Sequence, residues 1–507
     1  MRRVLRAVVP GVLLLLATPG TPGAPGRDSL QAGVVGLAVT HQGWDEQRPW
    51  AKTDPGVRRA SGVVVPGPYV LTTADIVGGA TFIQVEKFGR PAQATVRLVR
   101  LDPEVGLALL AIDTEGFFSD LRPVELAEAT PTDGTLQTVR WQDQQFESAA
   151  SRVKRFRVAE SEYGRLQHLF LEVQTDLQGG GWAEPVFHGQ RLTGLTSSQD
   201  RDERAKVIPI EIVRTFLERA TAAGEYRDFP VFGANWQINK DRALSAFLGQ
   251  RGEPRGVVIR EVPWGTSACS AISPRDILLA LDGVEIDAEG FYTHPRFGQI
   301  LFPQLLVERF AAGDSVAATV LRGGQRVETT MKLRPYPVGV HLIPERRPHA
   351  APPYLIVGGL VFRELDADYL RSWGTDWMVN APADLKVRYH LEQDGQRPDR
   401  RRIVVLSSVL PAEYNIGYQD LSEMIVREVD GITVDGLDDI VDALAHPMNG
   451  FHVVAFEPNP SRLELTLDAA TLDAATAEIL ATYDIPAARR LPDTPPPDGG
   501  PACAGAP

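Results

Sequence analysis

The sequence predicts a mainly β protein, built of barrels or a sandwich and followed by smaller α+β modules. Short segments of strand length, rich in Val, Ile, Leu and Thr, recur over residues 33–125 and again over 134–208. Turn-forming residues separate these segments, and the chain contains 46 Gly and 39 Pro. Regularly spaced short strands favour barrels or a sandwich over a parallel sheet, whose strands alternate with helices.

The first β-rich stretch contains five segments that we expect to be strands. Clusters of Gly and Pro separate them and favour turns, at 66–68, 78–79 and 89–91. The expected strands are Ser61–Val65, Tyr69–Thr73, Phe82–Glu86, Ala94–Val99 and Leu107–Ile112.

A helix is expected to start at Pro209 and to end near Gly224. Proline is favourable at the first position of a helix. Apolar residues then recur at helical spacing on one face, namely Ile212, Val213, Phe216, Leu217 and Ala220. Two further α+β units follow, each with an Asp-Gly pair between apolar residues, at 282–283 and 430–431. This pair is a strong signal of a tight hairpin turn.

Residues 1–24 have the layout of a secretory signal peptide. Arg2, Arg3 and Arg6 precede an apolar run over 7–17, and small residues, Pro and Gly follow it. The run is shorter than the roughly 20 residues that a membrane-spanning helix needs. We therefore expect an exported protein, periplasmic or extracellular, with no stable membrane span. A short membrane anchor is the alternative.

The balance of charges argues against one class of partner. The 52 Lys and Arg residues and 65 Asp and Glu residues give a net charge of −13, which becomes −16 without the three arginines of residues 1–24. Nucleic-acid binding needs a basic surface that displaces counterions from phosphates, so we expect no nucleic-acid partner. The sequence has two cysteines, Cys269 and Cys503, too few for a disulfide framework or a cysteine zinc site. We predict no metal and no cofactor.

Four motifs follow one another in an order that points to a family. They are Ala60-Ser61-Gly62-Val63-Val64, Leu71-Thr72-Thr73-Ala74-Asp75-Ile76-Val77, Gly106-Leu107-Ala108-Leu109-Leu110 and Gly180-Gly181-Trp182-Ala183-Glu184-Pro185. In this order they resemble the HtrA/Deg family of exported serine proteases, in which a two-barrel trypsin-like domain precedes PDZ domains. Later segments resemble the plant Deg branch more closely, at 207–209, 229–233, 356–362 and 414–418.

The resemblance covers residues 33 to about 487 and implies a domain organisation. A trypsin-like (chymotrypsin-type) domain of two barrels would be followed by two PDZ-like domains with a Pro-rich linker between them. The expected boundaries are 1–24 for the signal peptide, 30–224 for the trypsin-like serine protease-like domain, 225–338 for the PDZ domain, 339–353 for the linker, 354–487 for the second PDZ-like domain and 488–507 for a disordered tail.

The resemblance places the family's catalytic histidine, aspartate and serine at Asp75, Gly106 and Trp182. Indole has no nucleophilic oxygen, glycine has no side chain, and a carboxyl group of ordinary pKa is a poor proton donor near neutral pH. We therefore expect no catalytic residue at these positions. The plainer interpretations are a surface or capping carboxylate for Asp75 and core filling for Trp182. Ala183 and Glu184 replace two glycines, and a Glu184 that faced the oxyanion hole would oppose the oxyanion.

Two functions remain open. The first is a proteolytically inactive homologue that serves as a peptide- or protein-binding scaffold or regulator in protein quality control. It would form a homo-oligomer, or a hetero-oligomer with an active relative. The alternative is an active serine-type endopeptidase with an unorthodox site, for which the barrels offer His41, His168, His188, Ser197 and Ser198.

A loop of apolar-apolar-Gly-apolar form marks the expected peptide-binding site. PDZ domains hold the terminal carboxylate of a partner on converging N–H groups and add the partner to a sheet edge as a strand. Val231, Phe232, Gly233 and Ala234 have this form, and a helix over 300–311 is expected to wall the groove. The partners would be carboxyl-terminal peptides or unfolded proteins. Alternatively, these four residues are plain core and the groove is closed.

Overall fold

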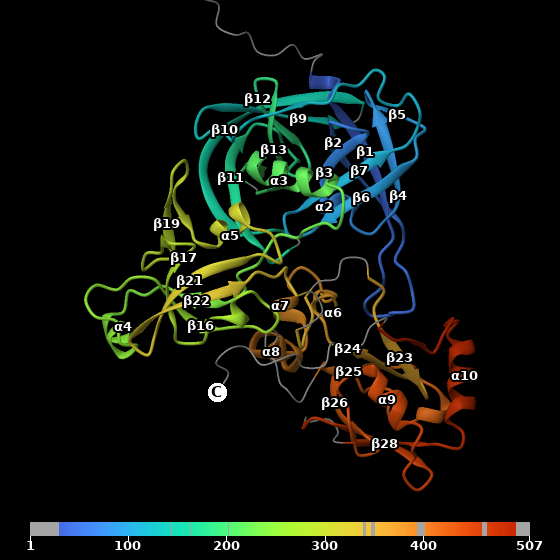
Figure 1. The fold of residues 1–507 in the computed structure, drawn as a ribbon. Coiled ribbons are helices and arrows are strands. Elements are labelled where there is room, and N and C mark those ends of the chain that lie inside the picture. The colour runs from blue at the N-terminus through green and yellow to red at the C-terminus, as the bar shows by residue number, and fades with distance from the viewer. Residues whose placement is uncertain are drawn as a thin grey trace, which may run out of the picture.

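The computed structural model describes residues 30–492 except 143, 163, 201, 338–340, 346–349, 393–400 and 459–463. Two β barrels lie side by side, and two α+β units follow them (Figure 1). The mainly β architecture expected from the sequence is confirmed. The expected signal peptide, 1–24, and residues 493–507 of the expected tail lie outside the described residues.

The first barrel is a sheet with the strand order β5-β4-β1-β2-β3-β7-β6. Its elements are β1 (Val34–His41), β2 (Gly56–Val65), β3 (Tyr69–Thr73), α2 (Ala74–Val77), β4 (Ala80–Lys87), β5 (Arg90–Pro91), β6 (Val96–Asp102) and β7 (Leu107–Ile112). All five expected strands are present, and β2 starts five residues before the expected Ser61.

Strand β7 is buried along its whole length because it separates two cores. Side chains of a strand alternate between its two faces. Leu110 and Ile112 accordingly join the interior of the first barrel, whereas Leu107 and Leu109 join the core between the barrels. The uninterrupted apolar run of this strand is thus required by burial on both faces.

The second barrel is closed. Its strands follow the order β12-β9-β10-β11-β14-β13-β8, and β12 also pairs with β13. They are β8 (Glu125–Leu126), β9 (Thr135–Gln142), β10 (Gln145–Glu160), β11 (Gln167–Thr175), β12 (Pro185–His188), β13 (Arg191–Gln199) and β14 (Arg204–Pro209). Helix α3 (Ile210–Thr221) follows directly after Pro209, and its expected apolar face is buried at Ile212, Val213, Phe216 and Leu217.

The first α+β unit has a sheet of order β15-β16-β17-β21-β22, in which β15 is an edge strand. The unit contains β15 (Asn235–Gln237), α4 (Arg242–Phe247), β16 (Val257–Glu261), η1 (Ala268–Ser270), β17 (Ile277–Leu281), β18 (Val284–Glu285), β19 (Phe291–His294), β20 (Gly298–Leu301), α5 (Pro303–Arg309), β21 (Ser315–Arg322) and β22 (Gln325–Lys332). Asp282 and Gly283 join β17 to β18 with φ of 49° and 73°, as a tight hairpin requires.

The second α+β unit has a sheet of order β29-β28-β26-β25-β24-β23-β30. Asp430 and Gly431 form its expected hairpin turn, with φ of 53° and 77°. The unit contains β23 (Tyr354–Val357), β24 (Leu360–Glu364), α6 (Ala367–Arg371), α7 (Trp377–Asn380), α8 (Ala383–Glu392), β25 (Val404–Val409), η2 (Glu413–Asn415), β26 (Met424–Val429), β27 (Ile432–Thr433), α9 (Leu437–Ala443), β28 (Phe451–Phe456), β29 (Glu464–Asp468), α10 (Leu472–Thr482) and β30 (Arg489–Arg490).

Two expected boundaries of this unit need correction. Strand β30 lies in the expected disordered tail, yet it pairs with β23 through Leu355 and Tyr354. Leu342 and Ile343 lie in the expected linker, yet they are buried in one apolar cluster with Leu365. Both segments are ordered because they complete the apolar packing or the strand pairing of the unit.

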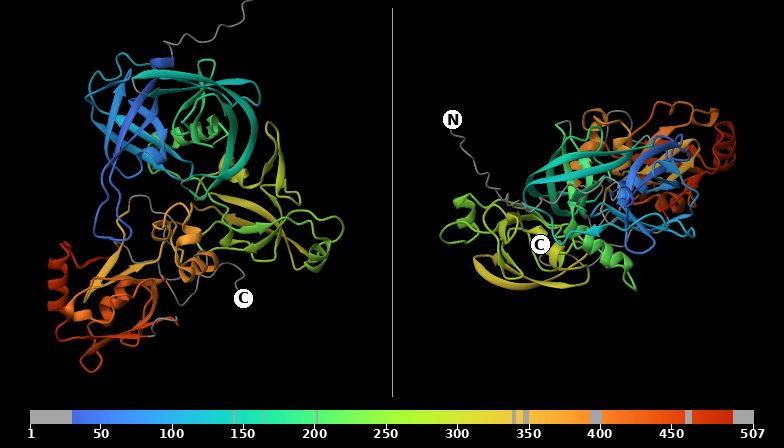
Figure 2. Two further views of the ribbon diagram at one scale, coloured as in Figure 1. Left: turned by 180° about the vertical axis from the view of Figure 1, so that it is seen from behind. Right: turned by 90° about the horizontal axis from the view of Figure 1, so that it is seen from above.

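A long loop over residues 42–55 leaves the first barrel and reaches the second α+β unit. Figures 1 and 2 show it running from the barrel to the vicinity of β23. Trp50 contacts the ring of Tyr354 edge-on, with 6.0 Å between the ring centroids. The second unit is therefore in contact with the first barrel. None of the helices in the described part of the chain has the length and apolar character needed to cross a membrane.

Candidate functional site

The structure brings the three positions matched to the family's catalytic residues to the boundary between the barrels. Helix α2 carries Asp75, and the N–H group of the preceding Ala74 donates to the carbonyl oxygen of Gly106 at 2.9 Å. The loop between β11 and β12 carries Trp182, and the next residue, Ala183, packs in the same apolar cluster as Ile76. The three segments thus converge in space.

The exposure of two of these residues differs from the plainer interpretations, although a capping role for Asp75 stays a prediction. Asp75 is not a surface carboxylate, because it is only 8% exposed, and this burial raises its pKa. Trp182 does not fill the core, because it is 47% exposed. Gly106 has φ of +71°, in the left-handed region, which glycine adopts without steric cost.

Side chains of the chain itself occupy the amide groups of the loop around Trp182. The N–H group of Gly181 donates to Oε2 of Glu184 at 2.8 Å, and the N–H group of Gly180 donates to Oε1 of Gln199 at 3.2 Å. Glu184 also accepts from the Thr196 hydroxyl, and burial raises the pKa of its carboxyl group. Glu184 therefore faces inward.

The three barrel histidines lie in different surroundings. His41, at the end of β1, contacts the carbonyl oxygen of Ile76 through Nε2 at 2.9 Å. His168 is fully buried on β11, which lowers its pKa to about 4, and His188 is exposed at the end of β12. Of the two candidate serines, Ser198 donates to Oε1 of Glu162 at 3.0 Å. These contacts do not assemble a serine and a histidine into a catalytic pair.

The expected peptide-binding loop lines a pocket of about 400 Å³. Val231, Phe232 and Ala234 are buried, and Gly233 has φ of +80° with its Cα directly against Thr266. Only glycine fits here, because an added Cβ atom would lie 2.3 Å from Cβ of Thr266.

Two amide groups of this loop have no hydrogen-bond partner among the described residues. The N–H group of Val231 donates to the carbonyl oxygen of Arg334 at 2.9 Å. Those of Phe232 and Gly233 have no acceptor within the described part of the chain. Free N–H groups of successive residues at the wall of a pocket can hold an anion such as a terminal carboxylate.

Other domains contribute to the same pocket. Arg165 and Gln167 come from the second barrel, Arg260 comes from β16, and His390 and Leu391 come from α8 of the second α+β unit. These residues were not predicted from the sequence. They lie far from the loop in the sequence, and no local pattern marks them.

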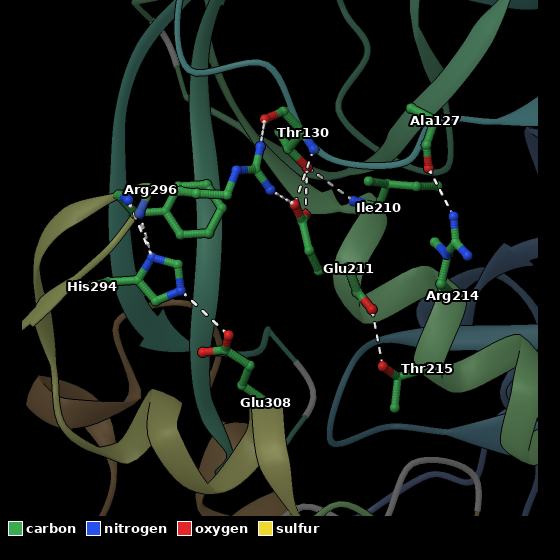
Figure 3. Close-up of polar contacts among 10 residues, drawn as sticks. Ala127, Thr130, Ile210, Glu211, Arg214, Thr215, His294, Arg296 and Glu308 are labelled. Atoms are coloured by element: carbon green, nitrogen blue, oxygen red, sulfur yellow. Dashed lines mark hydrogen bonds and ion pairs between the residues drawn. The ribbon is translucent and has the colours of Figure 1, made fainter. Parts of the chain in front are cut away.

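The helix expected to wall the groove is α5, and it is shorter than the expected range 300–311. Gln304 on this helix accepts a hydrogen bond from the N–H group of Leu169 on β11 at 2.8 Å. The neighbouring β19–β20 hairpin also contacts the barrels (Figure 3), where Arg296 donates to Oε1 of Glu211 at 2.8 Å and to the carbonyl oxygen of Thr130 at 2.6 Å. The first α+β unit is thus fastened to the second barrel.

The corresponding loop of the second α+β unit is closed. The N–H group of Gly358 donates to the Thr476 hydroxyl of α10 at 2.8 Å. Nδ2 of Asn415 donates to the carbonyl oxygen of Gly358 at 2.9 Å. Among the described residues, no group of three or more His, Cys, Asp and Glu side chains is placed to hold a metal ion.

A family model of the PDZ domain matches residues 343–490. Protease Do-like 2 of Arabidopsis thaliana, a chloroplastic protein, is 25% identical over 463 residues, which cover 90% of this chain and 74% of the relative. Protease Do-like 4 of the same plant, a mitochondrial protein, is 26% identical over 402 residues, which cover 78% of this chain and 73% of the relative.

A solved structure of the HtrA-type protease AlgW with a decapeptide is 19% identical and has a TM-score of 0.46, covering 61% of this chain and 97% of that one. The matches to curated proteases run through both barrels and the units that follow, and the PDZ model accounts for the second unit. The chain is therefore an HtrA/Deg-type protease homologue with a PDZ domain.

Proposed function

We propose that this chain is a proteolytically inactive HtrA/Deg homologue that binds the carboxyl ends of peptides or unfolded proteins at its first PDZ unit, residues 225–338. In protein quality control it would act as a scaffold or regulator. One contrast carries the proposal. The amide groups of Phe232 and Gly233, beside a pocket, have no acceptor among the described residues, whereas those of Gly180 and Gly181 are bound to side chains of the chain itself.

The chemistry of the three matched positions supports inactivity. Peptide hydrolysis by this route needs a nucleophilic oxygen, a base that later acts as an acid, and a group that orients the base. Trp182, Asp75 and Gly106 do not together supply a nucleophile, a base and an orienting group. Loss of triad members leaves about 10³–10⁴-fold acceleration over water, and that remainder depends on the oxyanion hole. Here the carboxylate of Glu184 holds the amide of Gly181.

The first PDZ unit offers what a carboxyl-terminal segment needs. Its loop supplies free N–H groups for the carboxylate, and the edge strand β15 directly after the loop can accept a further strand. Phe232 and Trp236 line the pocket, and both contact the buried ring of Phe302.

Binding is tested with fluorescein-labelled decapeptides that have randomised last four residues, once with free and once with amidated carboxyl ends. The full chain is expected to retain the free-carboxyl pool and not the amidated pool. Gly233→Ala should abolish retention, because the new Cβ atom would collide with Thr266. Gly313→Ala is the matched control, since Gly313 also has a positive φ (+94°) but has open space around it. Equal retention of both pools contradicts the proposal.

Inactivity is tested with casein and with a fluorophosphonate probe that labels any activated serine. We expect neither cleavage nor labelling. Labelling that a single Ser→Ala substitution removes would instead establish the alternative, an endopeptidase with an unorthodox site.

We further propose that the chain is exported to the periplasm or outside the cell, and that it forms a homo-oligomer or joins the oligomer of an active relative. The first statement rests on the arginines and apolar run of residues 1–24. Mass spectrometry of the mature chain should find its start near residue 25. Light scattering, with and without an active relative, should give a mass above that of one chain.

A further inference from the structure

Helix α8 of the second PDZ unit places two side chains on the pocket of the first. His390 and Leu391 line the pocket together with Phe232 and Gly233, whose N–H groups have no acceptor in the part of the chain that the structure describes. We propose that α8 completes the peptide site of the first PDZ unit, and that Leu391 contacts an apolar side chain within the last few residues of the bound chain. This inference rests on the proposed function and adds to it the class of carboxyl terminus that is bound.

Leu391 is 77% exposed although it lines the pocket. An apolar side chain in water at the rim of a binding site gains free energy when a ligand covers it. Exposure alone does not select Leu391, because Val387, one helical turn earlier on α8, is 53% exposed and does not line the pocket. The position of Leu391 beside the free amide groups is what distinguishes the two.

A set of polar contacts holds α8 beside the pocket. The hydroxyl of Tyr389 donates to Oε1 of Glu345 at 2.6 Å, and Arg165 forms an ion pair with the same carboxylate. Arg371 approaches its other oxygen at 3.4 Å. Burial disfavours the charge of Glu345, but these contacts together keep its pKa below the ordinary value.

Arg165 also lines the pocket and lies 3.6 Å from Glu160 of β10. Glu345 thus joins the second barrel to α8. The site is therefore built from three parts of the chain, namely the barrel, the first PDZ unit and α8. Its rim adds an apolar contact that a PDZ domain alone would lack.

The experiment compares retained peptides by mass spectrometry, using the same free-carboxyl and amidated pools and the full chain. The wild-type chain should enrich apolar residues within the last four positions. Leu391→Ala should still retain free-carboxyl peptides but lower this apolar enrichment about tenfold, the loss expected for a buried leucine contact. Leu391→Met should restore most of it. Val387→Ala, on the same helix, should behave as the wild type.

The possible outcomes distinguish this inference from the proposed peptide-binding function on which it rests. Unchanged apolar enrichment in Leu391→Ala, or retention without apolar enrichment in the wild type, overturns the role of α8 and leaves peptide binding intact. Equal retention of the free-carboxyl and amidated pools overturns both. Loss of enrichment in Val387→Ala to the same degree as in Leu391→Ala also overturns the proposal, because a general disturbance of α8 would then explain both.

Discussion

Glu46 of the first barrel and Arg363 of the second PDZ unit form an ion pair of 2.8 Å, although 317 residues separate them in the sequence. The guanidinium group of Arg363 is fully buried and lies 3.9 Å from the centroid of the Tyr369 ring. Asp366 lies 3.6 Å away on the same unit. The loop over 42–55 thus inserts a carboxylate between the barrel and the unit.

Glu46 should make stability depend on pH. Burial raises the pKa of Glu46 from 4.5 to about 7. Between these values the folded state keeps a proton that the unfolded state releases. The stability that Glu46 contributes is therefore full below about pH 4.5 and is lost as the pH rises to about 7, by on the order of 3 kcal/mol. Denaturant unfolding from pH 4.5 to 7.5 should show a steeper decline for the wild type than for Glu46→Gln. Parallel curves would contradict the assignment.

Restoring the catalytic side chains alone should not restore catalysis. In the variant Asp75→His, Gly106→Asp, Trp182→Ser, the amide of Gly181 stays bound to the carboxylate of Glu184. A fluorophosphonate probe should leave this variant unlabelled. Adding Glu184→Gly removes the internal acceptor and should permit the first detectable labelling. Equal labelling with and without this fourth change would show that the Glu184 contact has no part in inactivity.

Arg296 should hold the first PDZ unit against the barrels. Its two hydrogen bonds, to Glu211 and to the Thr130 carbonyl, involve a charged donor, and their loss should cost about 1–3 kcal/mol. We expect Arg296→Ala to lower the unfolding free energy and to increase amide hydrogen exchange in β19 and β20. Arg309→Ala is the control, because its ion pair with Asp282 lies within the first PDZ unit and is worth at most about 1 kcal/mol. Equal effects of the two substitutions would argue against the fastening role.

Arg490 should hold β30 in place. Its guanidinium carbon lies 4.0 Å from the centroid of the Trp44 ring, and Nη1 donates to the carbonyl oxygen of Pro49 at 2.9 Å. Arg490→Ala should therefore increase hydrogen exchange along β23, whose outer edge β30 covers. Arg489→Ala should change little, since Arg489 is exposed. Slow exchange in both variants would mean that the backbone pairing alone secures the strand.

Local structure could be predicted from the sequence where one segment determines its own geometry. The Asp-Gly turns and the apolar face of α3 needed no information from elsewhere in the chain. In the loop over 231–234, Gly233 likewise lies at a positive φ, although the role of this loop in peptide binding stays a prediction. From the sequence, an inward orientation of the Glu184 side chain was only one possibility and was not predicted.

Other features depend on tertiary contacts and could not be predicted. Trp182 looked like core because tryptophan is mostly buried, yet its loop holds it in solvent. Leu391 looked like one apolar residue of a helix, and only the fold places it at a pocket 160 residues away in the sequence. The ion pair between Glu46 and Arg363 could not be predicted, since no local sequence pattern links the two residues.

The pairing of β30 with β23 bears on how the molecule meets its neighbours. An open sheet margin carries unpaired N–H and C=O groups that attract extended segments of other chains. Here β30 pairs with Tyr354 and Leu355 of β23, so this part of the margin is protected from unwanted association. Proteolytic cleavage before Arg489 would remove β30. The truncated protein should then aggregate under conditions in which the intact protein does not.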